Sequence, residues 1–454
     1  MLYKQKIVRT LRCKNKNVRG TLAALITALS KAGADIGEIS TVLVGELHNV
    51  RDISIIVDDE AGLARVIKAA EKTPDVELQQ VIDDVLELHQ GGKLSLQPTF
   101  PVQSIEDLRK VYTPGVASVC KLIHDDPKQA VSYTTISKTV ALVTNGSRVL
   151  GLGNLGPVPS MPVMEGKAAL FAQFTGLNMI PILINTTDIN LFVKTVETIS
   201  KTFAAIQLED IQTPDCFEIE ERLQKLPIPI MHDDQHGTAV VSLAAAINAC
   251  KMAELDIHEV TIGQIGLGAA GSAIARLIMK YTSKPVIGFD LKEESLQRHK
   301  KFGGTTATLE ELMKKANLVI STTGQEGLIK PTMVRKGQVI LALSNPQPEI
   351  SIVEALKAGA SFASDGAQIN NLIGYPGIWK GVLDSGAQKM NKEMYIAAAE
   401  AIAHAAPERE LVPSPLDPWV HQRVARAVAR AAVTTGMATI SLDKDYFGEN
   451  EEPR

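Results

Sequence analysis

The segment GLGAAG, residues 266–271, constrains the fold of this chain more than any other feature. The apolar run EVTIGQI before it predicts a buried strand, and SAIARLIMKY after it predicts a helix. A second strand, KPVIGFD, ends at Asp290, about 20 residues after the last glycine. In this order the glycines let a pyrophosphate approach a helix N-terminus, and the acidic residue reaches a ribose. We therefore predict a Rossmann-type, doubly wound domain in which Gly266, Gly268, Gly271 and Asp290 bind a dinucleotide.

A second copy of the glycine pattern, GLGNLG at residues 151–156, has a different context. Pro157 and Pro159 follow it at once, so we expect no helix N-terminus to be presented in register with a phosphate. Its glycines are predicted to shape a loop against a ligand or a neighbouring strand.

Asp290 also bears on the choice of cofactor. A carboxylate pairs with the ribose 2′-hydroxyl of NAD and repels the 2′-phosphate of NADP. Lys292 and Arg298 lie close enough in the sequence to weaken that preference. The sequence therefore favours NAD and leaves NADP possible.

The composition excludes several classes of protein. With 45% hydrophobic residues, 22% charged residues and a net charge of −4, the 454-residue chain is typical of a globular protein and gives no reason to expect nucleic acid as a partner. No apolar run approaches the roughly 20 residues that a membrane span needs, and the N-terminus has no apolar signal core. The four cysteines are widely spaced and predict free thiols in a reducing cytoplasm.

Periodicity divides the chain into four regions of mixed α/β type. Residues 1–88 alternate in the ferredoxin-like βαββαβ order. This region resembles an ACT domain, a module that usually binds a small effector; a module that only assists dimerisation is the alternative. Residues 89–235 alternate between predicted strands and helices, and residues 236–370 contain the predicted dinucleotide domain. Residues 371–454 complete the chain, with a tail after Phe447 that is predicted to be disordered.

Two pairs of adjacent acidic residues follow predicted strands, Glu209 with Asp210 and Asp233 with Asp234. Close carboxylates repel one another unless a cation or protons neutralise them. Solvated loop carboxylates and a helix cap would explain either pair alone, but both pairs end strands ahead of the dinucleotide domain. Glu209, Asp210 and Asp234 would form an all-oxygen set that suits Mg²⁺ or Mn²⁺.

His232 and His236 flank the second acidic pair and raise the alternative of a zinc site. Histidines four residues apart share a face only on a helix. Gly237 and the apolar run PIPIM before His232 predict a strand-to-helix loop instead, so we expect the two histidines to be bystanders.

Lys167, in PVMEGKAALF, is predicted near the N-terminus of a helix of small residues. Burial and the positive end of the helix dipole both oppose its charge, which would suit a general base near neutral pH. A surface lysine on an amphipathic helix is the simpler interpretation. Tyr112, in KVYTPGVA, is equally unremarkable alone.

The region from about residue 100 to residue 440 resembles the malic enzymes, in their short bacterial form. The resemblance rests on eight motifs in order: VYTPGVA, TNGSRVLGLGNLGP, PVMEGKAALF, LEDI, HDDQHGTA, GLGAAG, LSNPQPE and INNLIGYPG. It implies oxidative decarboxylation of (S)-malate to pyruvate and CO₂ with reduction of NAD(P), dependent on a divalent metal. Malolactic conversion or oxaloacetate decarboxylation on the same scaffold is one alternative, and a catalytically silent effector-binding protein is another.

The resemblance implies that residues 89–235 are a substrate and metal domain and that the helices of residues 371–454 return to it. It also implies a role for each site residue. Tyr112 would be the general acid and Lys167 the general base. Asp233 would support three metal ligands, namely Glu209, Asp210 and Asp234. Three residues would bind malate, namely Arg148, Asn345 and Asn371. Further residues would join the glycines and Asp290 around the cofactor, namely Thr238, Thr323 and Asn345.

Oligomeric state is implied by the same resemblance. Family members are usually homodimers or homotetramers, and in short bacterial forms the active site can borrow residues from a neighbouring subunit. Tyr112 would then act across a subunit interface.

Overall fold

The computed structural model describes residues 6–150, 152–345, 347–367 and 369–448. The chain forms two compact units, Met1–Lys93 and Leu94–Arg454. The first unit extends past the predicted boundary at residue 88 and includes a short helix, α3 (Asp84–His89). The end of the predicted tail and Gly151 of the first glycine pattern lie outside the described residues. Among the residues that are described, no helix is both long and apolar enough to cross a bilayer.

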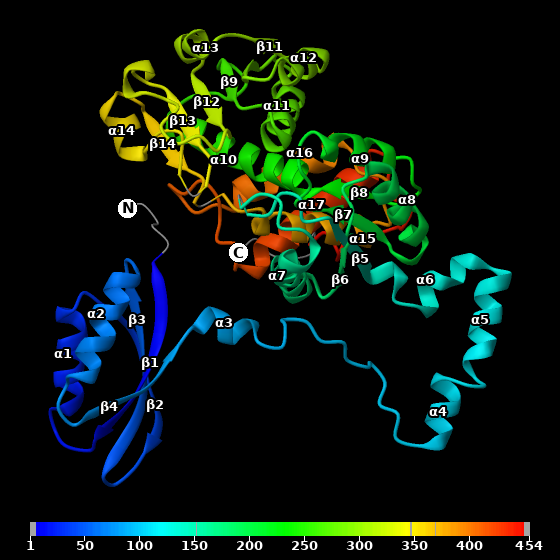
Figure 1. The fold of residues 1–454 in the computed structure, drawn as a ribbon. Coiled ribbons are helices and arrows are strands. Elements are labelled where there is room, and N and C mark those ends of the chain that lie inside the picture. Colours follow the sequence, from blue (N-terminus) through cyan, green and yellow to red (C-terminus); the bar gives the residue numbers. More distant parts are fainter. Residues whose placement is uncertain (1–5, 151, 346, 368, 449–454) are drawn as a thin grey trace. The chain divides into compact units, whose positions relative to one another are not determined.

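The first unit is a four-stranded antiparallel sheet with two helices (Figure 1). Along the chain it consists of β1 (Ile7–Lys16), α1 (Thr21–Lys31), β2 (Asp35–Val44), β3 (His48–Val57), α2 (Glu60–Glu71) and β4 (Val76–Ile82). The strand order is β2-β3-β1-β4, and the element order is the predicted βαββαβ. Leu11 and Ile53 of the sheet pack with Leu25 and Val66 of the helices in one apolar core, so both helices cover the same face.

Residues 94–138 contain short helices whose apolar side chains are not buried. The helices are α4 (Ile105–Val111), α5 (Val116–Asp125) and α6 (Ala130–Tyr133), with 3₁₀ turns at Pro127–Gln129 and Ile136–Lys138. No residue of α4, α5 or α6 is buried. Large apolar side chains, among them Ile105, Leu108 and Val131, therefore face solvent in the single chain.

Four strands form the first parallel sheet in the order β6-β5-β7-β8. The strands are β5 (Thr139–Thr144), β6 (Asn178–Leu183), β7 (Ala205–Leu208) and β8 (Ile230–His232). The connecting helices are α7 (Pro157–Thr175), α8 (Ile189–Ile199) and α9 (Asp215–Leu223). Every residue of β5, β7 and β8 is buried. Because the strands are parallel, the residues that follow them lie along one edge of the sheet.

Six strands form the second parallel sheet in the order β11-β10-β9-β12-β13-β14. The strands are β9 (Ile262–Ile265), β10 (Ile287–Phe289), β11 (Thr305–Thr306), β12 (Leu318–Ser321), β13 (Val339–Ala342) and β14 (Phe362–Asp365). The connecting helices are α11 (Ala269–Thr282), α12 (Glu293–Lys301), α13 (Leu309–Lys315) and α14 (Ile352–Lys357). Counted from β9, this is the order 3-2-1-4-5-6 of a dinucleotide-binding fold, so the predicted Rossmann-type domain is confirmed.

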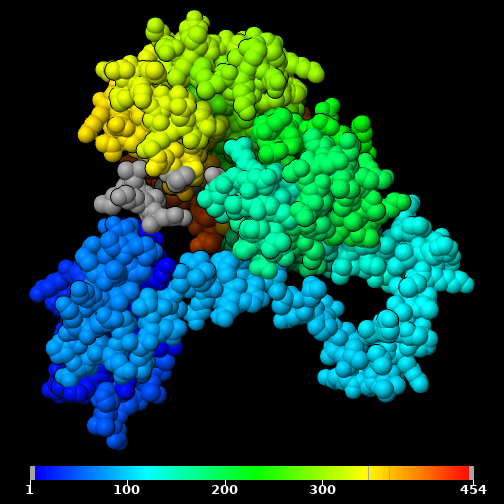
Figure 2. Space-filling model, in the orientation of Figure 1, coloured from blue at the N-terminus to red at the C-terminus, as the bar shows by residue number. Residues whose placement is uncertain are grey.

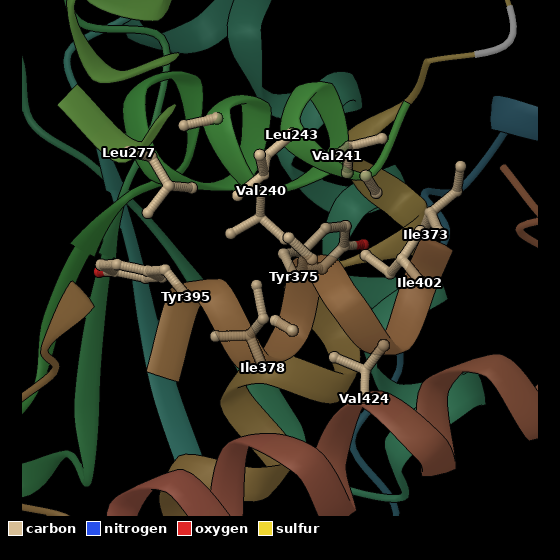
Figure 3. Packing of buried hydrophobic residues seen from close by; sticks show 14 of the residues in the cluster. Val240, Val241, Leu243, Leu277, Ile373, Tyr375, Ile378, Tyr395, Ile402 and Val424 are labelled. Atoms are coloured by element: carbon tan, nitrogen blue, oxygen red, sulfur yellow. The ribbon is translucent and has the colours of Figure 1, made fainter. Parts of the chain in front are cut away.

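One apolar core joins the two sheets. Figure 2 shows the green and yellow parts of the chain, which contain them, next to each other. It is built around α10 (Thr238–Met252) and the C-terminal helices α15 (Tyr375–Asp384), α16 (Lys392–Ala405) and α17 (Pro418–Thr434). Figure 3 shows Val240 of α10 beside Tyr375 and Ile378 of α15. α15 and α17 pack closely, since a Cβ at Gly377 or Gly381 would lie 2.4 Å from a carbonyl oxygen of α17.

The start of α7 differs from the prediction. The helix begins at Pro157, directly after the first glycine pattern, with Pro157 and Pro159 in its first turn. Proline is accepted there because the N–H groups of a first turn have no partner within the helix and the fixed φ of proline suits a helix. The expectation that these prolines prevent a helix N-terminus is therefore wrong.

Candidate active site

The two acidic pairs meet at one edge of the first sheet. Glu209 and Asp210 directly follow β7, while Asp233 and Asp234 directly follow β8, its parallel neighbour. One carboxylate oxygen from each of Glu209, Asp210 and Asp234 lies within 4.8 Å of the other two. Glu209 is 5% exposed and Asp210 8%, so water screens their charges poorly. The structure thus brings the three predicted metal ligands together.

The local backbone directs these carboxylates toward one another. Asp210 has a left-handed conformation with a φ of 52°, which aspartate tolerates better than most residues. Its N–H donates to Asp234 Oδ2 at 2.9 Å, and its carbonyl oxygen accepts from the Arg148 N–H at 3.0 Å. Asp233–Gly237 form a single π-helical turn. A Cβ at Gly237 would lie 1.8 Å from Asp233 Oδ1, so only glycine leaves room for that carboxylate.

Burial and mutual repulsion raise the pKa of two carboxylates in this group. Burial raises the pKa of Asp210 to about 7, and the negative charge of Asp234 adds to the effect. Burial also raises the pKa of Glu209, although the ammonium group of Lys167 opposes the increase. Three carboxylates form the hard oxygen set that Mg²⁺ and Mn²⁺ prefer, and a divalent cation would offset their charge. The residues present therefore fit the metal that the sequence predicts.

Lys167 lies in the middle of α7, not near its N-terminus. Its ammonium group donates to Glu209 Oε1 and, at 2.5 Å, to Asp233 Oδ2, and it lies 4.9 Å from the centre of the Tyr375 ring. Burial lowers the pKa of Lys167, but the charges of Asp233 and Glu209 raise it by more, so the net shift is well upward. The expected downward shift from a helix dipole is therefore wrong, because α7 begins at Pro157 and two carboxylates face the amine.

Asn371 and Thr238 lie beside Lys167 and its carboxylates. Thr238 begins α10, immediately after the π-helical turn, and Asn371 begins a 3₁₀ turn ahead of α15. Asn371 Nδ2 donates to Asp233 Oδ2 at 3.2 Å and to Thr238 Oγ1 at 3.0 Å. Four predicted site residues, Lys167, Asp233, Thr238 and Asn371, thus form one hydrogen-bonded group.

Arg148 lies on the same edge of the first sheet, in the loop after β5. Its side chain is exposed, and its positive charge lowers the pKa of Asp210, although burial and Asp234 have larger effects in the opposite direction. An exposed guanidinium near the carboxylate group is able to bind an anionic substrate.

The glycine pattern at residues 266–271 forms the turn between β9 and α11. Gly266 has a φ of 85°, and a Cβ at Gly271 would lie 1.9 Å from the Gly266 carbonyl oxygen. No atom of the described residues beyond its chain neighbours lies within 4 Å of a Cβ built on Gly268, which leaves space beside the helix N-terminus. Asp290 Oδ2 accepts from the Leu267 N–H at 2.7 Å, so the acidic residue lies against the turn.

Thr323 and Asn345 lie at the same edge of the second sheet, after β12 and β13 respectively. The N–H and Oγ1 of Thr323 donate to Glu349 Oε1 at 2.6 and 2.8 Å. Asn345 is exposed, and its Nδ2 donates to the Gly366 carbonyl oxygen at 3.1 Å. The described hydrogen bonds do not join Asn345 to the carboxylate group on the first sheet.

Tyr112 is not brought to Lys167 within the single chain. It is the residue at which α4 ends, and it is 68% exposed. Among the described residues, its hydroxyl makes no hydrogen bond with Lys167 or the four carboxylates. A role for Tyr112 at this site therefore requires a movement of residues 94–138 or a second copy of the chain.

Three buried polar contacts at the site were not anticipated from the sequence. Gln207 Nε2 donates to Glu209 Oε2 at 3.0 Å, and Trp379 Nε1 donates to Gln207 Oε1 at 2.6 Å. The Tyr375 hydroxyl donates to the Lys167 carbonyl oxygen at 2.8 Å. A glutamine inside the apolar strand AIQL was the available signal, because a buried amide requires partners.

The two histidines do not converge on a common point. His232 is fully buried, neither ring nitrogen has a hydrogen-bond partner among the residues that the structure describes, and burial lowers its pKa. His236 Nε2 lies 2.9 Å from Glu220 Oε1, and its ring stacks on Tyr395. The group of potential metal ligands among the described residues contains neither histidine. That the two histidines are bystanders stays a prediction.

Comparisons with known proteins indicate the family of the chain. Residues 92–224 match the family model "Malic enzyme, N-terminal domain", and residues 360–437 match "Malic enzyme, NAD binding domain". The chain is 51% identical over 431 residues to NAD-dependent malic enzyme 1 of Bacillus subtilis, covering 94% of this chain and 98% of that protein. It is 39% identical to the bifunctional malic/malolactic enzyme of Bacillus subtilis, covering 81% and 97%.

Solved structures give the same result. The crystal structure of malic enzyme from Pyrococcus horikoshii is 40% identical, with a TM-score of 0.76 over 81% of this chain and 94% of that chain. The NAD-dependent malic enzyme from Thermotoga maritima is 37% identical, with a TM-score of 0.72 over 76% and 99%.

Proposed function

Because the chain belongs to the malic enzyme family, we propose that the group around Lys167 is its active site and that Tyr112 completes it. The reaction is the oxidative decarboxylation of (S)-malate to pyruvate and CO₂ with reduction of NAD. One observation carries the assignment of residues. The amine of Lys167 is held between Glu209 and Asp233 at the edge where three carboxylates converge. A nitrogen base and an oxygen-ligand set for a cation thus occupy one place.

The side chains have distinct tasks in this scheme. Arg148 binds a carboxylate of malate, and Asn371 together with Asp233 orients the Lys167 amine. Lys167 Nζ, once it has lost its ammonium proton, accepts the proton of the C2 hydroxyl. NAD held at the glycine turn of residues 266–271 would supply the acceptor for the hydride of C2. The bond between C3 and C4 of the resulting β-keto acid breaks, CO₂ departs, and the electron pair remains as the enolate of pyruvate. Tyr112 then gives its hydroxyl proton to C3.

We propose that Glu209, Asp210 and Asp234 hold Mg²⁺ or Mn²⁺. When bound, the ion supplies a Lewis acid that polarises the substrate oxygens and offsets the carboxylate charge that faces Lys167. Glu209 belongs to both groups, since its Oε1 accepts from Lys167 and its Oε2 accepts from Gln207. The amide of Gln207 therefore fixes the orientation of a carboxylate that serves the metal and the base.

Metal affinity is expected to fall as the pH drops below about 7. Burial and Asp234 raise the pKa of Asp210 to about 7, so below that pH its carboxyl group carries a proton that a metal must displace. Each pH unit below 7 should weaken the apparent Mn²⁺ affinity about tenfold for each displaced proton. Calorimetric titration at pH 6 in two buffers of different ionisation enthalpy measures the protons released.

Asp210→Asn is the matched variant, because an amide has no proton to release. It should bind Mn²⁺ more weakly than the parent at pH 8 and show a shallower pH dependence. Release of no proton at pH 6 by the parent protein would contradict the assignment of Asp210.

We propose that Tyr112 acts in the site of a second copy of the chain, in a homodimer or homotetramer. It is 68% exposed and lies next to an apolar surface of α4 and α5 that the single chain does not bury. Such surfaces mark sites of association between subunits. A twofold axis would let each subunit donate its Tyr112 to the other.

Mixing two inactive variants tests this arrangement. Tyr112→Phe and Lys167→Ala subunits, dissociated and reassembled in equal amounts, should regain about a quarter of the parent activity, because half of the dimers are mixed and each has one intact site. Either variant reassembled alone is the control. Failure to regain activity, with mixed dimers verified by differential tags, would place Tyr112 and Lys167 of one site in the same chain.

We propose that residues 1–93 are an ACT-like regulatory module for a small-molecule effector. Its βαββαβ order and antiparallel sheet support this interpretation. We also propose that the protein is cytoplasmic. Its four cysteines are free, and three of them, Cys13, Cys216 and Cys250, are buried thiols that a reducing compartment would keep reduced.

Steady-state assay of the purified chain tests the reaction and the cofactor. With (S)-malate and Mn²⁺ we expect NADH and pyruvate in equal amounts, and slower turnover with NADP because Asp290 faces the dinucleotide turn. Lactate is measured in parallel, because one relative is named as a bifunctional malic/malolactic enzyme. Lactate without NADH would replace the oxidative reaction by malolactic conversion.

A further inference from the structure

A cavity of about 740 Å³ has a lining that includes neither Lys167, nor the four carboxylates, nor the glycines of residues 266–271. Its walls come from five helices, α9, α10, α11, α12 and α16, and from the π-helical turn, which contributes Gln235 and His236. This volume is far larger than a bound water or a simple ion needs and is typical of sites for small organic molecules. Three of the lining side chains are aromatic, namely Phe217, Phe302 and Tyr395. Figure 3 shows Tyr395 and Leu277, both of which line the cavity, at the margin of the apolar core.

The lining is rich in positive charge. Arg276, Arg298, Lys301 and Lys392 line the cavity, and among the described residues none of the four has a carboxylate oxygen within ion-pair distance. Burial lowers the pKa of Lys392, and the positive charges of Arg276 and Lys280 lower it further. These like charges repel one another in the absence of a counter-ion.

The two acidic side chains in the lining offset this charge only in part. Glu220 is almost fully buried and accepts hydrogen bonds from Gln235 and from the backbone N–H of His232, and it also pairs with His236. The oxygens of its carboxylate are therefore occupied by contacts with the π-helical turn and the residue before it. Glu221 is exposed on α9 and is the other acidic lining residue.

Aromatic rings fix the two arginines in place. The Arg276 guanidinium lies 3.9 Å from the centre of the Phe302 ring, and that of Arg298 lies 4.1 Å from the centre of Phe217. Arg298 also donates to the Leu267 carbonyl oxygen at 2.9 Å, while its buried Nε has no partner. A stacked guanidinium loses little conformational freedom on binding, and its planar fork matches a phosphate or carboxylate group.

From this lining we infer that the cavity is a regulatory site for a small organic polyanion that carries phosphate or carboxylate groups. The cationic side chains bind the anionic groups, and the aromatic and amide side chains of the walls contact the remainder of the molecule. The site requires nothing from the catalytic group, so it is independent of the roles proposed for Lys167 and Tyr112.

The position of the cavity explains why its occupant would affect turnover. The π-helical turn that presents Gln235 and His236 to the cavity also carries Asp233 and Asp234, which lie at the catalytic edge. α11 contributes Arg276 and begins at the glycine turn of the dinucleotide site. A ligand that contacts both the turn and α11 would therefore bind with different affinity to two states of the protein in which these elements are placed differently. This difference in affinity couples the cavity to the catalytic site.

Binding is tested by calorimetry on the full-length protein with three probes: pyrophosphate, ATP and citrate. NAD is present at saturation to occupy the dinucleotide turn, and divalent metal is left out because the probes chelate it. We expect at least one probe to bind one site per chain. Phosphate and carboxylate ligands are distinguished by whether pyrophosphate and ATP, or citrate, bind more tightly.

Variants of the cavity decide whether that binding is specific. Lys392→Gln and the double variant Arg276→Gln with Lys392→Gln should weaken binding, the double variant by about tenfold or more. Lys300→Gln removes the same charge from an exposed position on α12 next to the lining residue Lys301, and it should bind the probe as the parent does. Thermal unfolding of each variant without probe verifies that it is folded.

Kinetics provide the second readout. At fixed free Mn²⁺, the probe that binds should change the apparent KM for malate about fivefold, and the double variant should lose this response while keeping the parent KM without probe. Absence of binding by all three probes, equal binding by the double variant and the parent, or an unchanged KM at saturating probe would each overturn the proposal.

Discussion

Replacing Lys167 with alanine is expected to lower kcat for malate oxidation by about 10²–10⁴-fold, the range by which general bases contribute. The amine that would accept the C2 hydroxyl proton is lost, and no other lysine contacts the carboxylates in the described part of the site. NAD affinity should stay within about twofold, since the glycine turn lies on the other sheet. Stopped-flow measurement of NADH formation gives the rate of malate oxidation, and calorimetric titration gives the affinity for NAD.

The side effects of this substitution need separate control. Without the ammonium group, Glu209 and Asp233 keep buried negative charge that only protons or a metal offset, so the variant is assayed at saturating Mn²⁺ and its unfolding midpoint is recorded. Lys194→Ala removes an exposed lysine from α8 and should leave kcat unchanged. Parent-like kcat in the Lys167 variant would remove this residue from the proton-transfer step.

Local sequence patterns were sufficient to predict the dinucleotide-binding domain and the cluster of carboxylates. The turn at residues 266–271 is specified by residues adjacent in sequence, and Asp290 lies against it as expected. Glu209 and Asp234 were predictable as neighbours for a topological reason, because residues that follow parallel strands meet at one edge. Both inferences depend on the order of elements and not on side-chain contacts.

Tertiary contacts account for what the sequence did not reveal. The partners of Lys167 lie 42 and 66 residues away, and their charges reverse the pKa shift that burial alone would produce. Pro157 was interpreted as a barrier to a helix, although it occupies a position where proline is favoured. Trp379 donates a hydrogen bond to Gln207, which lies 172 residues away in the sequence, and hydrophobic periodicity does not predict such a contact. Tyr112 follows a helix in which no residue is buried, so contacts within the single chain do not place it at the site.

Replacing Asp234 with asparagine is expected to weaken Mn²⁺ binding about 100-fold or more, since loss of an outer-sphere partner alone costs 10–100-fold. The amide oxygen can still accept the Asp210 N–H that Asp234 Oδ2 accepts at 2.9 Å, so the backbone of residue 210 should keep its left-handed conformation. Mn²⁺ binding is measured by electron paramagnetic resonance of the free ion, which requires no turnover. Activity should be lost at micromolar Mn²⁺ and recover in part at millimolar Mn²⁺.

A matched surface change separates ligand loss from a general loss of negative charge. Glu218→Gln removes one charge from α9, where the carboxylate is exposed and pairs with Arg222, and it should bind Mn²⁺ as the parent does. Asp234→Asn also relieves repulsion within a buried acidic group, which alone would stabilise the metal-free fold. Ligand loss therefore predicts opposite changes: a higher unfolding midpoint without metal and a smaller increase in that midpoint on adding Mn²⁺. Equal stabilisation of variant and parent by Mn²⁺ would show that the ion is held elsewhere.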